Sequence, residues 1–528
     1  MPSTSPSRPS WAKDADGRAM SLPAELESAR QWIRGLARDY GLDFYPTIFE
    51  ILDYKAVNQV AAYGGYPTRY PHWRFGMEYD YLSKSYSYGL HRIYEMVINN
   101  DPAYAYLLEG NTMVDQKMVM AHVYGHVDFF KNNYIFAHTN RKMMDQMANH
   151  ATRIRRYVDK MGLERVETFI DTCLSLENLI DIHAPFVTRG PMRGDKPDKV
   201  DPSRLEVATL PAKGYMKDYI NPPEFMEAQR RKLAEAQEVE SRFPENPVRD
   251  VLAFLLAYAP LEPWQQEVLA ILREEAYYFA PQAQTKIMNE GWATYWHAKI
   301  MTEKVLDDTE IIDFADHHSR TLGGASTQIN PYKLGYELYK DIEDRWNKGR
   351  FGKEYDDCDD MVARAGWDRQ LGLGREKIFE IRRHYNDVTF IDSFLNEEFC
   401  HKQKMFMYNY DPRTGNWHIA SRDFPGIKQA FLAQLTNMGH PLITVLDANH
   451  ANRGELLLLH RHEGMDLKAD DAGATLAALQ AIWSRPVHIA TVVKGKPRVL
   501  SFDGSEHSES DLDLGDASLK DSRTDDTT

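Results

Sequence analysis

Hydrophobic residues recur every three or four positions through the first three quarters of the chain. Between residues 23 and 40, the apolar positions are Leu26, Ala29, Trp32, Ile33, Leu36 and Ala37. This spacing places them on one face of a helix. The same period predicts helices over residues 86–98, 112–133, 262–279, 284–300 and 332–347. Almost no alternation of polar and apolar residues occurs before residue 395, so this region is predicted to be mainly α.

The pattern changes after residue 395 to short runs typical of strands, separated by turn residues. Asp-Pro-Arg-Thr-Gly-Asn and Ala-Asn-His-Ala-Asn-Arg-Gly each separate two such runs and predict hairpins. Helical segments follow each hairpin, and a last pair of strands completes the order ββαββαββ; the predicted segments are 402–410, 417–421, 426–438, 442–447, 455–460, 470–483, 487–494 and 498–502. The predicted fold class is α+β, with a large mainly α N-terminal domain and a small C-terminal α+β domain.

Both ends of the chain are polar. Residues 1–22 lack periodicity, and the segment Asp503–Thr528 holds nine acidic and two basic residues. Such segments bury too little apolar surface to fold. We therefore predict a disordered N-terminus (1–22), a core domain (23–395), a C-terminal domain (396–503) and a disordered acidic tail (504–528). Deleting residues 505–528 is expected to leave the thermal stability nearly unchanged.

Composition restricts the class of protein. The chain has 528 residues, 43% of them hydrophobic, and a formal charge of -15. Outside the acidic tail this charge is small, which gives no electrostatic reason to expect nucleic-acid binding. The three cysteines, Cys173, Cys358 and Cys400, form neither a disulfide framework nor a thiolate metal site. No secretory signal and no apolar run long enough for a membrane span is found, so a cytoplasmic location is predicted.

The strongest chemical signal is a pair of histidines on one predicted helix. His122 and His126 are one helical turn apart, so both imidazoles can bind one metal ion. Glu290, on the helix predicted at 284–300, is the best third ligand, and His297, two turns later on that helix, is a further candidate ligand. Two histidines and a later carboxylate form the usual ligand set of zinc hydrolases, with one position open. The expected cofactor is therefore a divalent metal ion, zinc by this donor set.

Two glycines beside these residues support the assignment. Gly125 directly precedes His126, and Gly291 directly follows Glu290. A glycine inside a helix costs about 1 kcal/mol relative to alanine. We therefore expect another part of the chain to approach the backbone closely at each glycine.

The general base of the usual zinc-peptidase motif is missing. In H-E-x-x-H a glutamate follows the first histidine, but here that position is Val123. Glu274, Glu275 and His318 are the alternatives, each of which could equally be a solvated side chain. Glu275 is preferred, because the helix that carries it leads directly into the Glu290 helix, and His318 is the second catalytic candidate.

Two further motifs offer substrate-binding candidates. Asn330-Pro-Tyr-Lys presents Asn330, Tyr332 and Lys333 near a predicted helix start, where they could face a substrate or simply cap and pack. Trp73 lies in an aromatic, proline-containing stretch that is typical of a binding loop, although aromatic packing under a loop would read the same. Phosphate-cradling, dinucleotide and serine-hydrolase motifs are not found in the sequence.

Four long motifs together resemble the SpoVR family, named for stage V sporulation protein R. They are Tyr70-Pro-His-Trp-Arg-Phe-Gly76, the segment from His122 to Asn133, the segment from Pro281 to His297 and Asn330-Pro-Tyr-Lys-Leu-Gly335. The resemblance covers roughly residues 25–503. It implies a stress, sporulation or cell-envelope process, such as peptidoglycan or spore-cortex metabolism. It also implies a serine protein kinase and a von Willebrand-type protein, encoded nearby, as partners.

The Asn-Glu-Gly-Trp-Ala motif is similar in style to gluzincin-like peptidases. The leading hypothesis is therefore a metal-dependent, hydrolase-like member of this family with a gluzincin-like metal-site arrangement. The alternative is a non-catalytic regulatory or scaffold protein whose polar cluster is structural. An open coordination position would favour the first, and a closed, buried hydrogen-bond cluster the second.

Overall fold

In the computed structural model, described residues are 22–87, 95–187, 222, 226, 243–323 and 329–512. The predicted disorder of residues 1–22 lies outside them, apart from residue 22. The chain divides into two units, one made of Met1–Leu163 and Tyr278–Gly439, the other of Glu164–Tyr277 and His440–Thr528. Among the described helices, none is both long and apolar enough to cross a membrane.

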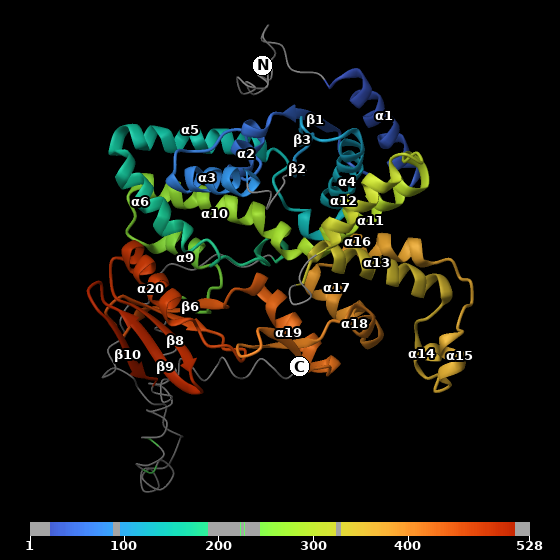
Figure 1. Ribbon diagram of the computed structural model, residues 1–528. Coiled ribbons are helices and arrows are strands. Elements are labelled where there is room, and N and C mark those ends of the chain that lie inside the picture. The colour runs from blue at the N-terminus through green and yellow to red at the C-terminus, as the bar shows by residue number, and fades with distance from the viewer. Residues whose placement is uncertain are drawn as a thin grey trace, which may run out of the picture. The chain divides into compact units, whose positions relative to one another are not determined.

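The first unit is mainly helical, as its sequence period predicts (Figure 1). Its helices are α1 (Ala24–Asp39), α2 (Tyr54–Ala62), α3 (Trp73–Ser87), α4 (Met113–Asn132), α5 (Met143–Met161), α11 (Lys286–Ile300), α12 (Ile311–Leu322), α13 (Pro331–Lys348), α14 (Lys353–Asp356), α15 (Met361–Ala365), α16 (Gly374–His384), α17 (Asp387–Phe394), α18 (Glu397–Gln403) and α19 (Phe424–Leu435). β4 (Met407–Asp411) and β5 (Asn416–Ser421) form a two-stranded antiparallel hairpin.

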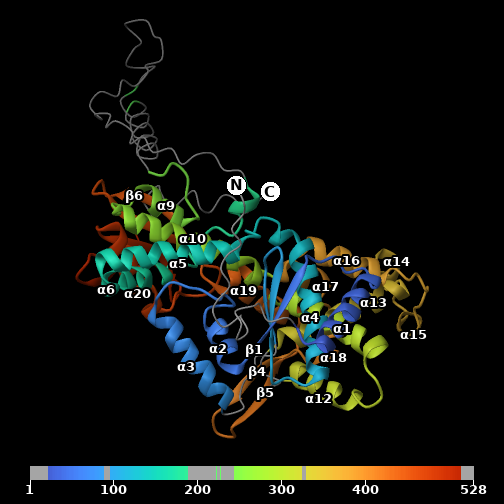
Figure 2. The same ribbon diagram turned by 90° about the horizontal axis from the view of Figure 1, so that it is seen from above.

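A three-stranded sheet in this unit was not predicted. Its strands are β1 (Thr47–Leu52), β2 (Glu95–Ile98) and β3 (Ala103–Leu108), in the order β1-β3-β2, with β1 parallel and β2 antiparallel to β3. The helix predicted over 86–98 is therefore wrong at Glu95–Ile98. β3 is largely buried on both faces, so its sequence lacks the alternation that marks a half-exposed strand. Figure 2 shows these strands beside α4.

Helix α4 is the centre of the first unit. Thr112 and Asp115 form a capping box at its start, and fifteen of its residues are buried. A helix that is buried on all sides must be surrounded by other elements, and α4 packs against α1, α11, α12 and the sheet. Helix α11 in turn lies between α4 and α13.

The second unit carries the predicted C-terminal sheet. Its strands are β6 (Ile443–His450), β7 (Glu455–His460), β8 (Val487–Val493), β9 (Lys496–Phe502) and β10 (His507–Asp511), in the order β10-β9-β8-β7-β6. Its helices are α6 (Leu163–Leu174), α9 (Val251–Tyr258) and α20 (Ala469–Trp483), while α10 (Pro263–Gln284) runs from this unit into the first. The α+β class is confirmed, and the predicted order ββαββαββ matches the elements from β4 to β9, after which β10 adds a ninth element.

Two domain predictions differ from this arrangement. The first unit includes β4, β5 and α19, and the second includes residues 164–277, so the division does not follow the predicted boundary after residue 395. Composition shifts along a chain do not show which distant segments pack together. The predicted tail is wrong for residues 507–511, which form β10 and pair with β9. Their side chains are polar because this edge strand is exposed.

Candidate metal centre

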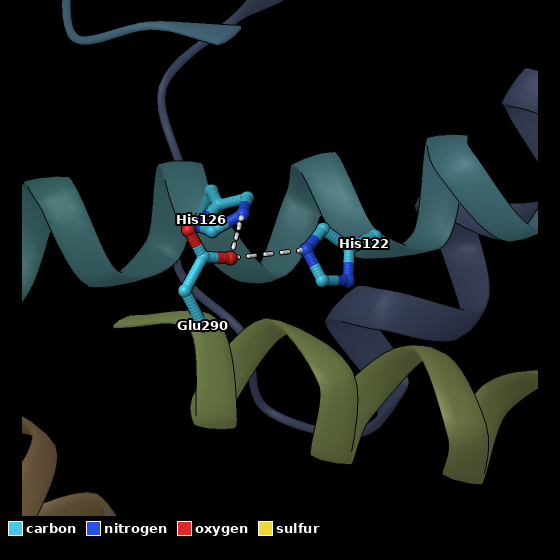
Figure 3. Close-up of side chains that lie close together, drawn as sticks. All are labelled: His122, His126 and Glu290. Atoms are coloured by element: carbon cyan, nitrogen blue, oxygen red, sulfur yellow. Dashed lines mark ion pairs between the residues drawn. The ribbon is translucent and has the colours of Figure 1, made fainter. Parts of the chain in front are cut away.

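Helix α4 presents His122 and His126 to α11, where Glu290 faces them (Figure 3). Oε2 of Glu290 lies 3.8 Å from Nε2 of His122 and 3.5 Å from Nε2 of His126. One ligand atom from each of the three side chains lies within 4.8 Å of the other two. Both histidines are buried, and the Glu290 side chain is 18% exposed. The tertiary structure therefore brings together the three residues that the sequence singled out first.

Close helix packing at the two glycines holds this geometry. A Cβ atom on Gly125 would lie 2.7 Å from Cα of Ala293, so α4 and α11 meet backbone to backbone. A Cβ atom on Gly291 would collide with the backbone of Gly335 in α13. The predicted close approach at both glycines is confirmed. It fixes the position of Glu290 along the helix axis relative to the two histidines.

The second ring nitrogen of each histidine has a different partner. Nδ1 of His126 lies 2.9 Å from Oδ1 of Asn289. An amide oxygen only accepts, so Nδ1 of His126 carries a proton, and in the neutral ring its Nε2 keeps a lone pair. Nδ1 of His122 lies 2.7 Å from Nδ1 of His297, whose Nε2 lies 3.2 Å from Nδ1 of His318.

Burial favours the neutral form of both outer histidines. Burial, with a smaller contribution from neighbouring imidazoles, holds the pKa of His297 well below its usual range. Burial and the nearby Lys340 ammonium also lower the pKa of His318. His297 contacts the Nδ1 side of His122, whereas Glu290 faces the Nε2 side. The structure therefore does not place His297 among the three convergent ligand atoms, and its predicted ligand role gains no support from this geometry.

The predicted substrate-binding residues divide into two groups. Asn330 accepts a hydrogen bond from the N–H of Lys333 and donates to the carbonyls of Thr321 and Gly323, so it caps α13 and ties it to α12. Tyr332 stacks on His122 with ring centroids 6.3 Å apart, which places it at the site.

Lys333 and Trp73 are both exposed. Lys333 lies in the first turn of α13, and Trp73 begins α3 with its ring beside His72. Neither exposure nor these contacts give either residue a link to the three ligand atoms. Their substrate-binding roles stay predictions.

The two catalytic candidates also separate. His318 reaches the site through His297. Glu275 is buried on α10 and is not one of the three described residues whose ligand atoms converge. Its role as general base stays a prediction. Val123 is fully buried.

Two supporting residues were missed by the sequence reasoning. Asn289 directly precedes Glu290, and a polar residue in an otherwise apolar helix was the available signal. Asp387 accepts hydrogen bonds from the N–H groups of Ile287 and Met288 and so holds the start of α11. Nothing in the local sequence of Asp387 indicates that contact, because about a hundred positions separate the partners.

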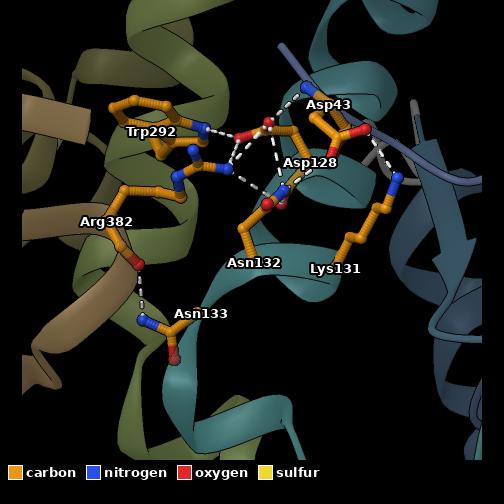
Figure 4. Close-up of polar contacts among 7 residues, drawn as sticks. All are labelled: Asp43, Asp128, Lys131, Asn132, Asn133, Trp292 and Arg382. Atoms are coloured by element: carbon orange, nitrogen blue, oxygen red, sulfur yellow. Dashed lines mark hydrogen bonds and ion pairs between the residues drawn. The ribbon is translucent and has the colours of Figure 1, made fainter. Parts of the chain in front are cut away.

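A buried ion pair anchors the far side of the same helices (Figure 4). Nη1 of Arg382 lies 2.9 Å from both carboxylate oxygens of Asp128, which also accept hydrogen bonds from the Trp292 indole and the Asp43 N–H. Asp128 lies on α4 and Trp292 on α11, so the carboxylate joins the two helices that carry the metal-ligand candidates.

Comparisons with known proteins agree with the motifs. A family model described as SpoVR like protein matches residues 21–440, and one described as SpoVR-like C-terminal domain matches residues 441–494. Uncharacterized protein YcgB of Escherichia coli (strain K12) is 30% identical over 410 residues, which are 73% of this chain and 75% of that protein. No solved structure matches the chain.

Proposed function

The chain belongs to the SpoVR family, and within that frame we propose that it is a metal-dependent hydrolase that holds a zinc ion through His122, His126 and Glu290. The observation that carries this proposal is the convergence of three ligand atoms, within 4.8 Å of one another, from two helices far apart in the sequence.

The residues present fit a divalent ion. Ligand atoms bound tetrahedrally at 2.0–2.2 Å lie roughly 3.3–3.6 Å apart, which is close to the 3.5 Å and 3.8 Å between the Glu290 oxygen and the imidazole nitrogens. That oxygen is buried and has no hydrogen-bond partner among the described residues. Burying a carboxylate without a partner is costly, and a cation between it and the histidines removes the cost.

Asn289 and His297 support the ligand histidines. Second partners of this kind fix the tautomer and the ring orientation of metal-binding histidines. A bound zinc ion supplies a Lewis acid and lowers the pKa of a water molecule. Tyr332 stacks on one side of His122.

The biological setting is part of the same proposal. We place the protein in a stress, sporulation or cell-envelope process, with a peptidoglycan-like substrate and with a serine protein kinase and a von Willebrand-type protein as partners. The three cysteines are all unpaired, which supports a reducing, cytoplasmic location.

A second candidate function is favoured by the burial of the cluster. His122 and His126 are 2% and 4% exposed, as expected of a closed structural cluster in a regulatory or scaffold protein. In that case the side chains stabilise the α4 and α11 contact, and no exchangeable ion is needed.

Metal analysis distinguishes the two functions. Purified full-length protein is expected to contain about one zinc ion per chain by elemental analysis, and Glu290→Gln, which keeps the shape of the side chain, is expected to lose most of it. Glu303→Gln, outside the cluster but near the end of the same helical run, is the matched control and should keep its metal. Metal-free wild-type protein that also fails to bind added Zn²⁺ would support the scaffold function instead.

A further inference from the structure

The imidazoles of His122, His297 and His318 form a series of hydrogen bonds. The donors and acceptors of this series can be arranged in either of two directions. Each contact joins two ring nitrogens, at 2.7 Å between His122 and His297 and at 3.2 Å between His297 and His318. A neutral imidazole has one N–H donor and one acceptor nitrogen. When all three rings are neutral, these two contacts allow only two consistent arrangements of their protons.

In the first arrangement, Nδ1 of His122 donates to Nδ1 of His297. His297 then has its proton on Nε2 and donates it to Nδ1 of His318. The Nε2 lone pair of His122 points toward Glu290, so this arrangement leaves His122 able to bind a metal ion.

In the second arrangement, each proton sits on the other ring nitrogen. Nδ1 of His297 donates to His122, whose own proton now lies on Nε2 and points at the Glu290 carboxylate. No lone pair of His122 then faces the site, so this arrangement excludes the ion.

Packing holds the ring of His318 in one orientation. Phe314 stacks on His318 with an interplanar angle of 14°, and Tyr336 meets it edge on. His297 is buried between His122 and His318, with Phe314 also against its ring. Fixed rings preserve the nitrogen-to-nitrogen geometry, so the direction of the series is the remaining variable.

We propose that His297 and His318 are positioning residues that act as acceptors in series, hold the proton of His122 on Nδ1 and so present its Nε2 to the ion. This proposal rests on the proposed metal site and deepens it. The partner of His126 is an amide oxygen that only accepts. The partner of His122 is His297, which can donate or accept. The affinity of the site for the metal ion therefore depends on which ring nitrogens of His297 and His318 carry protons.

The test compares variants that keep or remove the acceptor. In His297→Asn, Oδ1 replaces Nδ1 of the imidazole, whereas His297→Leu fills the space without an acceptor. Zn²⁺ affinity, measured by competition with a chromophoric chelator, is expected to fall about 10- to 100-fold in His297→Leu, the usual effect of losing such a partner, and to stay near the wild-type value in His297→Asn. His318→Leu is expected to weaken binding less than His297→Leu and more than His318→Asn.

A matched control measures the cost of losing any buried imidazole. His150 on α5 is fully buried beside Gln146, and His150→Leu should leave Zn²⁺ affinity unchanged. Equal weakening in His297→Leu and His297→Asn would show a packing role and overturn the proposal, as would wild-type affinity in a folded His297→Leu. Should His297→Leu fail to fold, the comparison of His318→Leu with His318→Asn decides.

A second readout does not need the metal. ¹⁵N shifts of histidine-labelled, metal-free protein distinguish Nδ1–H from Nε2–H tautomers. The proposal expects Nδ1–H for His122 in the wild type and a gain of Nε2–H in His297→Leu. Absence of metal binding in the wild type would remove the proposed function, whereas an Nε2–H tautomer of wild-type His122 would remove this inference.

Discussion

Gly125 of α4 faces Ala293 of α11 so closely that a Cβ atom on the glycine would lie 2.7 Å from Cα of the alanine. The contact lies one residue before His126 and on the same helix as Glu290. Because glycine has no side chain, the two helices that supply the candidate ligands can pack at this short separation.

Gly125→Ala tests this separation. Alanine favours the helix by about 1 kcal/mol, but here it must push α11 away, and such overpacking costs about 1–3 kcal/mol. We expect a lower melting temperature and weaker Zn²⁺ binding. Gly35→Ala is the control, because Gly35 is exposed in α1 with nothing within 4 Å of an added Cβ, and it should raise the melting temperature slightly. Stabilisation by both substitutions would contradict the close packing.

The buried Asp128 and Arg382 pair predicts a large effect from breaking one side. Arg382→Met leaves the Asp128 carboxylate in the protein interior, a change that costs about 3–5 kcal/mol in buried pairs. Chemical denaturation should show this loss, and the double variant Asp128→Asn, Arg382→Met should recover part of it. Arg369→Met, which removes an exposed pair with Glu354, is expected to change little. A small effect of Arg382→Met would mean that the pair does not hold α4 to α11.

Asp387 predicts a pH dependence of stability. Burial raises the pKa of this carboxyl to about 7, although the N–H groups of Ile287 and Met288 oppose the rise. An acid whose pKa is higher in the folded than in the unfolded protein stabilises the fold at low pH, and this contribution is lost as the pH rises through about 7. Relative to wild type, Asp387→Asn should therefore be more stable at pH 8 than at pH 5. Thermal melts of both proteins across that range measure the difference, and parallel profiles would contradict it.

The edge strand β10 changes the expected effect of truncation. Deleting residues 505–528 removes five residue pairings with β9, from His507 opposite Phe502 to Asp511 opposite Arg498. Each lost hydrogen bond costs about 0.5–1.5 kcal/mol, so the melting temperature should fall. Deleting only residues 513–528 removes a charged segment with few apolar side chains and should leave it unchanged. Equal melting temperatures for the two truncations would show that β10 adds no stability.

The sequence by itself determined the local structure and the identity of the main candidates. The helical period predicted α4 and α11, turn residues predicted strands β6 to β9 of the C-terminal sheet, and the spacing of His122 and His126 required one helix face. Gly125 and Gly291 also indicated tertiary contacts. A glycine destabilises a helix, and this is tolerated where another backbone must approach closely. These features are all readable within a turn or two of the chain.

The tertiary structure alone decided which distant groups meet. β3 was invisible because a strand buried on both faces loses its alternation, and the role of Asp387 depends on a contact about a hundred residues away. His297 had the right residue type for a ligand, but it lies two turns beyond Glu290 on the same face of α11 and contacts the Nδ1 side of His122. Sequence spacing specifies a helix face, whereas the position of one helix along another is set by packing of the whole core.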